Sequence, residues 1–436
     1  MDRTVSGLRL AALLLLGGLA ACTERELILP GEREGIRPEV TSAVAEDRAI
    51  PALSVPAPRT NSDWGHLNGN AAHLAPSVAL PVNLNRIWSV DLGQGAARRV
   101  RLISAPVVSG GRIFAMDAAN QLTAVSAAGG VLWRTDLSRV GEGGTEGFGG
   151  GLAARGDILV ATTGFGEVLR VDPATGAEIW RSPVEGAVRA APTLADDKVI
   201  VVARGDLGYG LDLATGEIDW RIEGIGQGAG LIGGSSPAVR GPLAVLPFQS
   251  GEIRATLVRN GLTVWTAAVT GGRRDLARAI INDISGDPVI DNDVVYAANQ
   301  AGRIVALDRR DGTRLWTQQD GSYGPALVVG NAIFVVSDTA ELVRIDAVDG
   351  ASVWRRPLPA FRNPDRRRVA IPHYGPLLAG GRLIVASGDG VLRSFDPTNG
   401  TPLGDVTLPG AVTAQPAIAN ATLYVVTENG SLHALR

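Results

Sequence analysis

The chain has 436 residues, of which 56 are glycine, 45% are hydrophobic and 19% are charged. Glycine is about twice as frequent as usual, which excludes a mostly helical protein, and the apolar content excludes a disordered one. The formal net charge of −3 gives no overall basic surface for nucleic acid, and the single cysteine excludes an internal disulfide or a thiolate zinc site.

The first 22 residues have the pattern of an export signal. Arg3 and Arg9 precede the apolar run 10–19, which is too short to span a membrane and predicts a signal peptide over residues 1–21. Leu19-Ala20-Ala21-Cys22 resembles the bacterial lipoprotein signal, in which the cysteine is acylated and becomes the mature N-terminus. The alternative is an ordinary signal peptide with a chance cysteine. Because Thr23 stands where an Asp commonly retains such proteins in the inner membrane, the resemblance implies the periplasmic face of the outer membrane.

Residues 22–61 have no usable periodicity and are rich in Pro, Glu, Arg and Ala. They predict a flexible, lipid-anchored tether with a root-mean-square span of roughly 35 Å. The several acyl chains of a bacterial lipoprotein would hold it firmly, since each buried CH₂ contributes about 0.8 kcal/mol. A short interfacial or partner-binding helix in this stretch stays open.

Residues 62–436 contain a repeated pattern, Asp-x-x-Thr/Asp/Asn-Gly followed by tryptophan four residues after the glycine. The glycine and the tryptophan recur at Trp133, Trp180, Trp220, Trp265, Trp316 and Trp354, and a seventh copy has Gly404 in place of tryptophan. Two short apolar strands precede each copy, and most repeats open with a proline. This unit predicts a four-stranded antiparallel meander. The aspartate would accept backbone N–H bonds, the glycine would take a positive φ, and the tryptophan would pack one sheet on the next.

The repeat count predicts the architecture. After the seventh copy the sequence holds only three more strands, and the missing fourth is available near the N-terminus at Asn85-Arg-Ile-Trp88. Pairing these strands would close a ring and leave no edge at the junction. The sequence therefore predicts an all-β protein, an eight-bladed β-propeller of four-stranded antiparallel blades closed by strands from both termini.

The spacing between repeats indicates where a partner binds. From the opening proline to the tryptophan the step is constant at about 28 residues, whereas the connection to the next repeat varies widely. In a propeller these connections run from an outer strand to the next inner strand, so they share one face. Insertions gathered on one face are typical of a binding side.

The repeats resemble those of pyrroloquinoline-quinone-type propellers, over residues 64 to 436. Two families share them: quinoprotein dehydrogenases and the BamB outer-membrane protein assembly factors. The dehydrogenases typically carry an adjacent cysteine pair over the quinone, which this chain cannot form because Cys22 is its only cysteine. The lipoprotein signal, tether and compact propeller resemble the BamB family. That resemblance implies a scaffold without enzymatic activity that binds the BamA insertase and other assembly-machinery subunits and helps to insert outer-membrane proteins. A quinoprotein dehydrogenase-like enzyme is the alternative.

In that family the insertase contacts come from the connections entering blades four and five. Leu231 and Asp283 fall on family contact positions, whereas Ala229, Ile232 and Ser285 depart from the residues that other members carry. We expect the two connections to expose Leu231, Ile232, Ile281 and Ile284 beside Asp283 as a partner-binding surface. Unfolded outer-membrane proteins are a further possible partner.

Other groups of residues that could form a functional site are only weakly indicated by the sequence. The four histidines show no metal spacing, and no catalytic motif is present, so we expect no catalytic residue, metal or cofactor. Arginines concentrate in the long loops after Trp354 (Arg362, Arg366–Arg368) and Trp265 (Arg273–Arg274). They predict either a solvated basic face or a surface for an acidic partner or lipid head groups.

Overall fold

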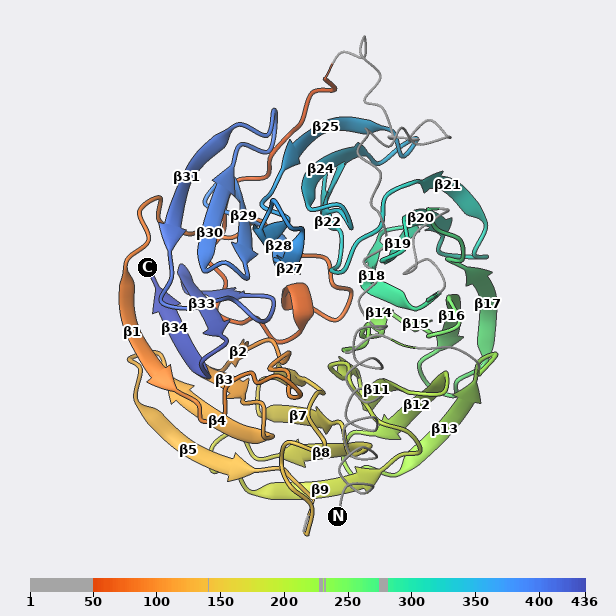
Figure 1. The fold of residues 1–436 in the computed structure, drawn as a ribbon. Helices are drawn as coiled ribbons and strands as arrows, with labels where there is room; N and C mark the ends of the chain where they lie inside the picture. The colour runs from red at the N-terminus through yellow and green to blue at the C-terminus, as the bar shows by residue number, and fades with distance from the viewer. Residues whose placement is uncertain (1–49, 140, 227–229, 231–232, 274–280) are drawn as a thin grey trace, which may run out of the picture. The chain divides into compact units, whose positions relative to one another are not determined.

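The computed structural model describes residues 50–139, 141–226, 230, 233–273 and 281–436. Apart from one 3₁₀ turn, η1 (Leu67–Gly69), the described elements are all strands, and they form eight four-stranded antiparallel sheets arranged around a centre (Figure 1). The predicted eight-bladed propeller is confirmed. Among the described residues no helix is long and apolar enough to cross a membrane.

Blades one to four follow the chain in order, with the first strand of each innermost. They are β2 (Val107–Ser109), β3 (Arg112–Met116), β4 (Gln121–Ser126) and β5 (Val131–Asp136); β6 (Leu152–Arg155), β7 (Ile158–Thr163), β8 (Glu167–Val171) and β9 (Glu178–Pro183); β10 (Thr193–Ala195), β11 (Lys198–Ala203), β12 (Leu207–Asp212) and β13 (Ile218–Glu223); β14 (Ala238–Arg240), β15 (Leu243–Pro247), β16 (Glu252–Leu257) and β17 (Thr263–Ala268).

Blades five to seven continue the pattern, and a small hairpin precedes blade seven. The blades are β18 (Ile284–Asp291), β19 (Val294–Asn299), β20 (Arg303–Asp308) and β21 (Arg314–Gln318); β22 (Leu327–Val329), β23 (Ala332–Val336), β24 (Glu341–Asp346) and β25 (Ser352–Pro357); β28 (His373–Ala379), β29 (Arg382–Ser387), β30 (Val391–Phe395) and β31 (Pro402–Thr407). The hairpin is β26 (Phe361–Asn363) with β27 (Arg368–Ala370).

Blade eight closes the ring as the sequence predicts. Its strands are β32 (Ala417–Ala419), β33 (Thr422–Thr427), β34 (Ser431–Leu435) and, from the other end of the chain, β1 (Arg86–Asp91). Strand β1 runs antiparallel to β34, with Trp88 opposite Ala434. Beyond this ladder, Asn85 and Arg436 exchange both backbone hydrogen bonds at 2.9 Å, which locks the two ends of the ring together.

The turn between the third and fourth strands has the expected chemistry. In blade three, Asp212 Oδ1 accepts the backbone N–H groups of Ala214 and Thr215 at 2.9 Å. Gly216 ends the turn with a φ of +77°. The same aspartate-capped turn recurs at Asp172, Asp308, Asp346 and Asp396. These aspartates are therefore structural.

The tryptophans join each blade to the next. Each indole packs under the turn glycine of the following blade, and its Nε1–H donates to a carbonyl in that turn at 2.8–3.1 Å, as Trp180 does to Leu213 and Trp220 to Val258. Seven of the eight inter-blade contacts are made this way. The exception, between blades seven and eight, has Gly404 instead of tryptophan. Blade eight has no such turn to receive an indole, because its outer strands come from opposite ends of the chain.

Residues 59–85, which we call the central segment, run around the inner strands from blade to blade. Trp64 exchanges backbone hydrogen bonds with Val108 of blade one, and the Gly65 carbonyl accepts from Ala154 of blade two. Further along, the Ala71 and Ala72 carbonyls accept from Val239 and Ile290 of blades four and five. The central segment thus visits the blades in ring order, and its η1 turn lies at the centre of the ring (Figure 1).

Two buried histidines belong to this segment. His66 Nε2 accepts the backbone N–H of Leu194 in blade three at 3.1 Å, and His73 Nδ1 donates to the Pro288 carbonyl in blade five at 2.9 Å. Desolvation by burial lowers the pKa of His66 to about 3 and that of His73 to about 4, so both rings are neutral near pH 7. Residues 64–73 thus pack on the propeller, and their two histidines are structural.

Residues 50–61 were assigned to the tether by sequence, yet they contact the propeller. The Pro51 carbonyl accepts a hydrogen bond from Arg344 of blade six at 2.7 Å, and Leu53 and Val55 pack against the core. Asn61 bonds to the Ile418 carbonyl of blade eight at 2.6 Å. Cys22 and the rest of the predicted tether lie outside the described residues.

Candidate partner-binding face and central cavity

The connections entering blades four and five lie side by side. At Gly230, in the first connection, an added Cβ would lie 2.1 Å from the Gln249 side chain and 3.3 Å from Asp283 Oδ2 in the second. Both connections run from an outer strand to the next inner strand, and so occupy one face of the ring. The described parts of the two connections therefore adjoin at Gly230 and Asp283.

The structure places the individual residues of the predicted surface in different environments. Leu231 and Ile232 lie outside the described residues. Ile281 is half-buried, and its carbonyl accepts from Gln300 at 2.8 Å. The expectation that Ile284 is exposed is wrong: it opens strand β18, is 1% exposed and packs in the core of blades four and five. Asp283 is also buried, at 5% exposure, and lines the central cavity.

Two exposed side chains that sequence reasoning missed lie on this face. Ile225, just after β13, is 74% exposed, and Tyr323, in the connection entering blade six, is 51% exposed. The length of a connection indicates that it can reach a partner, but it does not say which apolar residue faces out. Among the described residues of the first connection, Ile225 offers an exposed apolar side chain.

Arg273 anchors the connection entering blade five, and is not part of a solvated basic face. Its guanidinium contacts Asp320 Oδ1 at 3.0 Å and Asp338 Oδ2 at 3.1 Å, and both carboxyl side chains are fully buried. Arg355 holds the other oxygen of Asp320 and contacts Glu341 at 2.9 Å. This network fixes the start of the connection to blades five and six. Arg274 lies outside the described residues.

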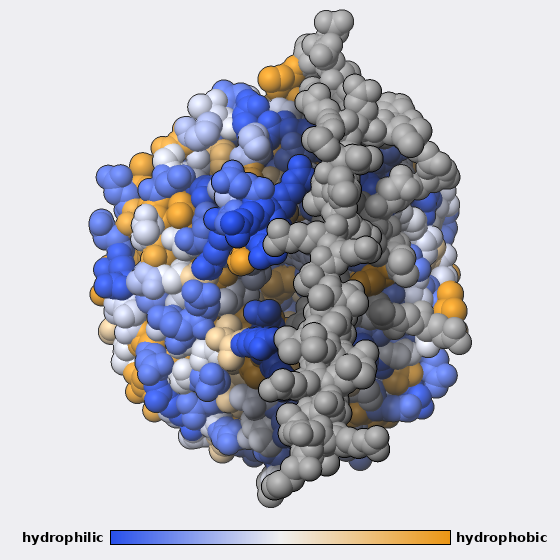
Figure 2. Space-filling model, in the orientation of Figure 1, coloured by the Kyte–Doolittle hydropathy of each residue, from blue (hydrophilic) through white to orange (hydrophobic). Residues whose placement is uncertain are grey.

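The arginines after Trp354 form an exposed basic hairpin. Arg362, Arg366, Arg367 and Arg368 lie in or beside β26 and β27 and are exposed. Arg362 donates to the Gly388 carbonyl at 2.7 Å and lies 3.9 Å from Glu428. Figure 2 shows hydrophilic side chains gathered around this hairpin.

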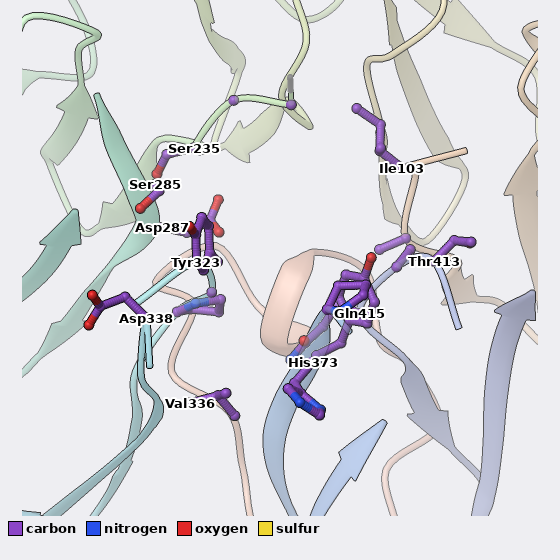
Figure 3. A pocket seen from close by; sticks show the side chains of 18 of the residues that line it. Ile103, Ser235, Ser285, Asp287, Tyr323, Val336, Asp338, His373, Thr413 and Gln415 are labelled. Carbon is purple, nitrogen blue, oxygen red and sulfur yellow. The ribbon is translucent and has the colours of Figure 1, made fainter. Parts of the chain in front are cut away.

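A cavity of about 1140 Å³ lies at the centre of the ring, on the face of the inter-blade connections. Leu67 of the central segment lines it, and Asn68, beside Leu67, accepts a hydrogen bond from Gln415 of the wall at 3.0 Å. In Figure 3, Ser235, Ser285, Asp287 and Tyr323 gather on one side of the cavity, and Ile103, Thr413 and Gln415 on the other. The cavity therefore has a polar wall, formed by the connections entering blades four to six.

Asp287 is the most unusual group in this wall. The residue is 8% exposed, and its Oδ1 accepts the backbone N–H of Ser236 at 2.5 Å. Desolvation by burial raises its pKa to about 6, against the opposing effect of the hydrogen bonds from Ser236. Within the described residues no group of three His, Cys, Asp or Glu side chains is arranged to hold a metal ion.

Comparison with known proteins identifies the repeats. A family model described as outer membrane protein assembly factor BamB matches residues 119–356 and 365–436. Curated proteins of that name from Moranella endobia and Yersinia pestis are 24% and 23% identical to this chain; the alignments cover 83% and 82% of it and 92% and 90% of the relatives.

Solved structures share the fold. The crystal structure of BamB from Moraxella catarrhalis has a TM-score of 0.67 at 20% identity, and the match covers 81% of this chain and all of that one. A quinohemoprotein alcohol dehydrogenase from Comamonas testosteroni has a TM-score of 0.65 at 14% identity, over 86% of this chain and 80% of that one. At these identities the structural likenesses establish the propeller alone.

Proposed function

This chain belongs to the family of outer membrane protein assembly factor BamB, and from that premise we propose that it is a scaffold of the machinery that assembles outer-membrane β-barrel proteins. The observation that carries the proposal is the family match over most of the propeller, together with relatives of that name aligned over nine-tenths of their own length. The propeller offers a rigid ring with a variable face, which suits a scaffold. The alternative of a quinoprotein dehydrogenase is supported by likeness of fold at 14% identity, which carries no function by itself.

We propose that the partner is a BamA-type insertase and that it binds the connections entering blades four and five. These connections adjoin at Gly230 and Asp283, and Ile225 offers an exposed apolar side chain. Arg273 pins the second connection to two buried carboxylates, so less ordering entropy is lost when a partner binds. Leu231, Ile232 and Ile281 complete the proposed surface, with Ile284 beneath it as core support. Other assembly-machinery subunits and unfolded outer-membrane proteins are further proposed partners.

The membrane attachment is proposed from the sequence. Acylation of Cys22 would place the protein on the periplasmic face of the outer membrane as a lipoprotein. With no catalytic motif in the sequence, the proposed role requires no enzymatic step or cofactor.

The partner surface is tested by replacing apolar side chains of the connection entering blade four. Ile225→Ala combined with Leu231→Ala is expected to weaken binding of the insertase's periplasmic domains at least tenfold, about 1.4 kcal/mol, measured by biolayer interferometry. Leu262→Ala is the matched control. Leu262 is 62% exposed but lies in the turn between β16 and β17, at the opposite end of the blade from the connections. Normal binding by the double variant, or an equal loss in the control, would place the partner elsewhere.

A further inference from the structure

The polar wall of the central cavity contains a buried carboxylate without a cation. Asp287 accepts hydrogen bonds from Ser236, and none of the described lysine, arginine or histidine side chains forms an ion pair with it. Folded proteins seldom bury a carboxylate without pairing it to a cation or a metal, because desolvation of the charge is costly. A cavity beside such a group gives a cation from outside the chain a place to bind.

A second polar group in the same wall also lacks a partner. Ser235 is 4% exposed and lines the cavity, and its Oγ has no hydrogen-bond partner within the described structure. A buried hydroxyl left without a partner costs about 1–3 kcal/mol. Figure 3 shows Ser235 and Asp287 on the same side of the cavity. An ammonium or guanidinium group donates several hydrogen bonds and can satisfy an acceptor pair of this kind.

The remainder of the cavity suits an apolar body attached to the cation. Ile103, Phe361, Ile371 and Ala414 line it away from Asp287. The volume of about 1140 Å³ is slightly above the usual range for small-ligand sites, roughly 300–1,000 Å³. The two arginines that line the cavity, Arg189 and Arg367, lie on the connections entering blades three and seven, two blades away from Asp287 on either side. Neither of these arginines therefore lies beside Asp287.

We propose that the central cavity is a binding site for an organic cation, a primary ammonium or guanidinium on an apolar stem, with Asp287 and Ser235 as the groups that bind its charge. Asp283 lines the same wall and adds a second carboxyl group to it. The cavity shares the connections entering blades four and five with the proposed insertase surface, but the binding of a cation there does not depend on the scaffold role. The cation could be a free amine or a basic side chain of an extended polypeptide.

Isothermal titration calorimetry of the full-length protein with hexylammonium tests the site. We expect one site per chain, no comparable binding of hexanol or hexanoate, and at least tenfold weaker binding by Asp287→Asn. That variant keeps an oxygen that can accept the Ser236 N–H, so its thermal unfolding should change little. Asp365→Asn is the matched control: it removes the same charge from an exposed position in the β26–β27 hairpin and should bind normally.

A second variant and a second probe complete the test. Ser235→Ala removes only an unpartnered hydroxyl, so it should fold as well as the parent and bind hexylammonium several-fold more weakly. A short lysine peptide that binds more tightly than hexylammonium, and loses binding when its lysine is acetylated, would identify a polypeptide as the source. Tighter binding of hexylammonium than of the peptide would identify a free amine as the source of the cation. Equal affinity in Asp287→Asn, equal binding of hexanoate, or binding of Ca²⁺ alone at Asp287 would overturn the proposal.

Discussion

The contact between neighbouring blades can be tested at Gly216, the turn glycine of blade three. Its φ is +77°, and an added Cβ would lie 2.6 Å from the buried indole of Trp180 in blade two. Gly381, in the β28–β29 turn, has a φ of +76° but no atom within 4 Å of an added Cβ. The two glycines therefore carry the same backbone constraint and differ in the close contact.

The structure sets the expected magnitudes. An alanine in the left-handed region costs about 1–2 kcal/mol, which is the whole expected effect of Gly381→Ala. Gly216→Ala adds overpacking against an indole that cannot move away, at roughly 1–3 kcal/mol. We therefore expect Gly216→Ala to destabilise the protein by about 2–5 kcal/mol. In a protein that already carries Trp180→Ala, the indole is absent. In that background Gly216→Ala should destabilise the protein only as much as Gly381→Ala destabilises the wild type.

The assay is a double-mutant cycle on Gly216 and Trp180 by urea unfolding, with calorimetry as a second probe. In a chain of this length each kcal/mol lowers the melting temperature by roughly 1–1.5 °C. The coupling energy between the two substitutions should be about 1–3 kcal/mol. If Gly216→Ala cost no more than Gly381→Ala, or if the two substitutions were additive, the tight packing of indole under glycine would be refuted as the joint between blades.

Three further results are expected. His66 and His73 are neutral in the folded protein and titrate near 6.5 when unfolded. Their contribution to the free energy of unfolding is thus complete above pH 6.5 and is lost as the pH falls towards 4 for His73 and 3 for His66. Between pH 7 and 5 the free energy of unfolding, measured with urea, should therefore fall by about 2 kcal/mol more in the wild type than in His66→Gln. Equal losses in the two proteins would contradict this prediction. Arg273→Met should lower the free energy of unfolding by about 2–3 kcal/mol. This is less than the ~3–5 kcal/mol expected for breaking a fully buried ion pair, because the guanidinium is 25% exposed. An unchanged free energy of unfolding would mean that the ion pair with Arg273 does not stabilise buried Asp320. Cys22→Ser should abolish labelling of the mature protein by a fatty-acid analogue in membrane fractions, and normal labelling would refute the anchor.

The sequence was sufficient for the fold because each local signal repeats. A turn glycine recurs in all seven copies, a tryptophan in six and an aspartate in five. Together they define a turn and the contact of one blade with the next, and this repetition leaves few arrangements other than a ring. Proline at the start of a strand was informative as well. Where Pro288 and Pro376 fall inside the longer strands β18 and β28, the ladder shifts register at that point, so neither proline removes a needed donor.

The candidate surface was less predictable, because exposure depends on where a connection ends and a strand begins. Ile284 was placed in a loop, but β18 begins there and turns the side chain into the core. Arg273 was interpreted as part of a charge cluster. Its partners are Asp320 in the connection entering blade six and Asp338 in the β23–β24 turn, and the sequence could not pair either with it. Asp287 gave no signal at all, since its burial depends on how eight separate connections converge.

Closure of the ring has a consequence for how the protein folds. Blades one to seven are meanders of neighbouring strands, whose local contacts can form early and quickly. The hydrogen bond between Asn61 and Ile418 spans 357 positions, and β1 pairs only with β34. Within the described structure β1 therefore has no ladder partner until blade eight has been synthesised and folded, although the central segment can already bond to blades one and two through Trp64 and Gly65. The slowest folding phase should be this final capture of β1, and chains halted before it would present an unpaired strand edge.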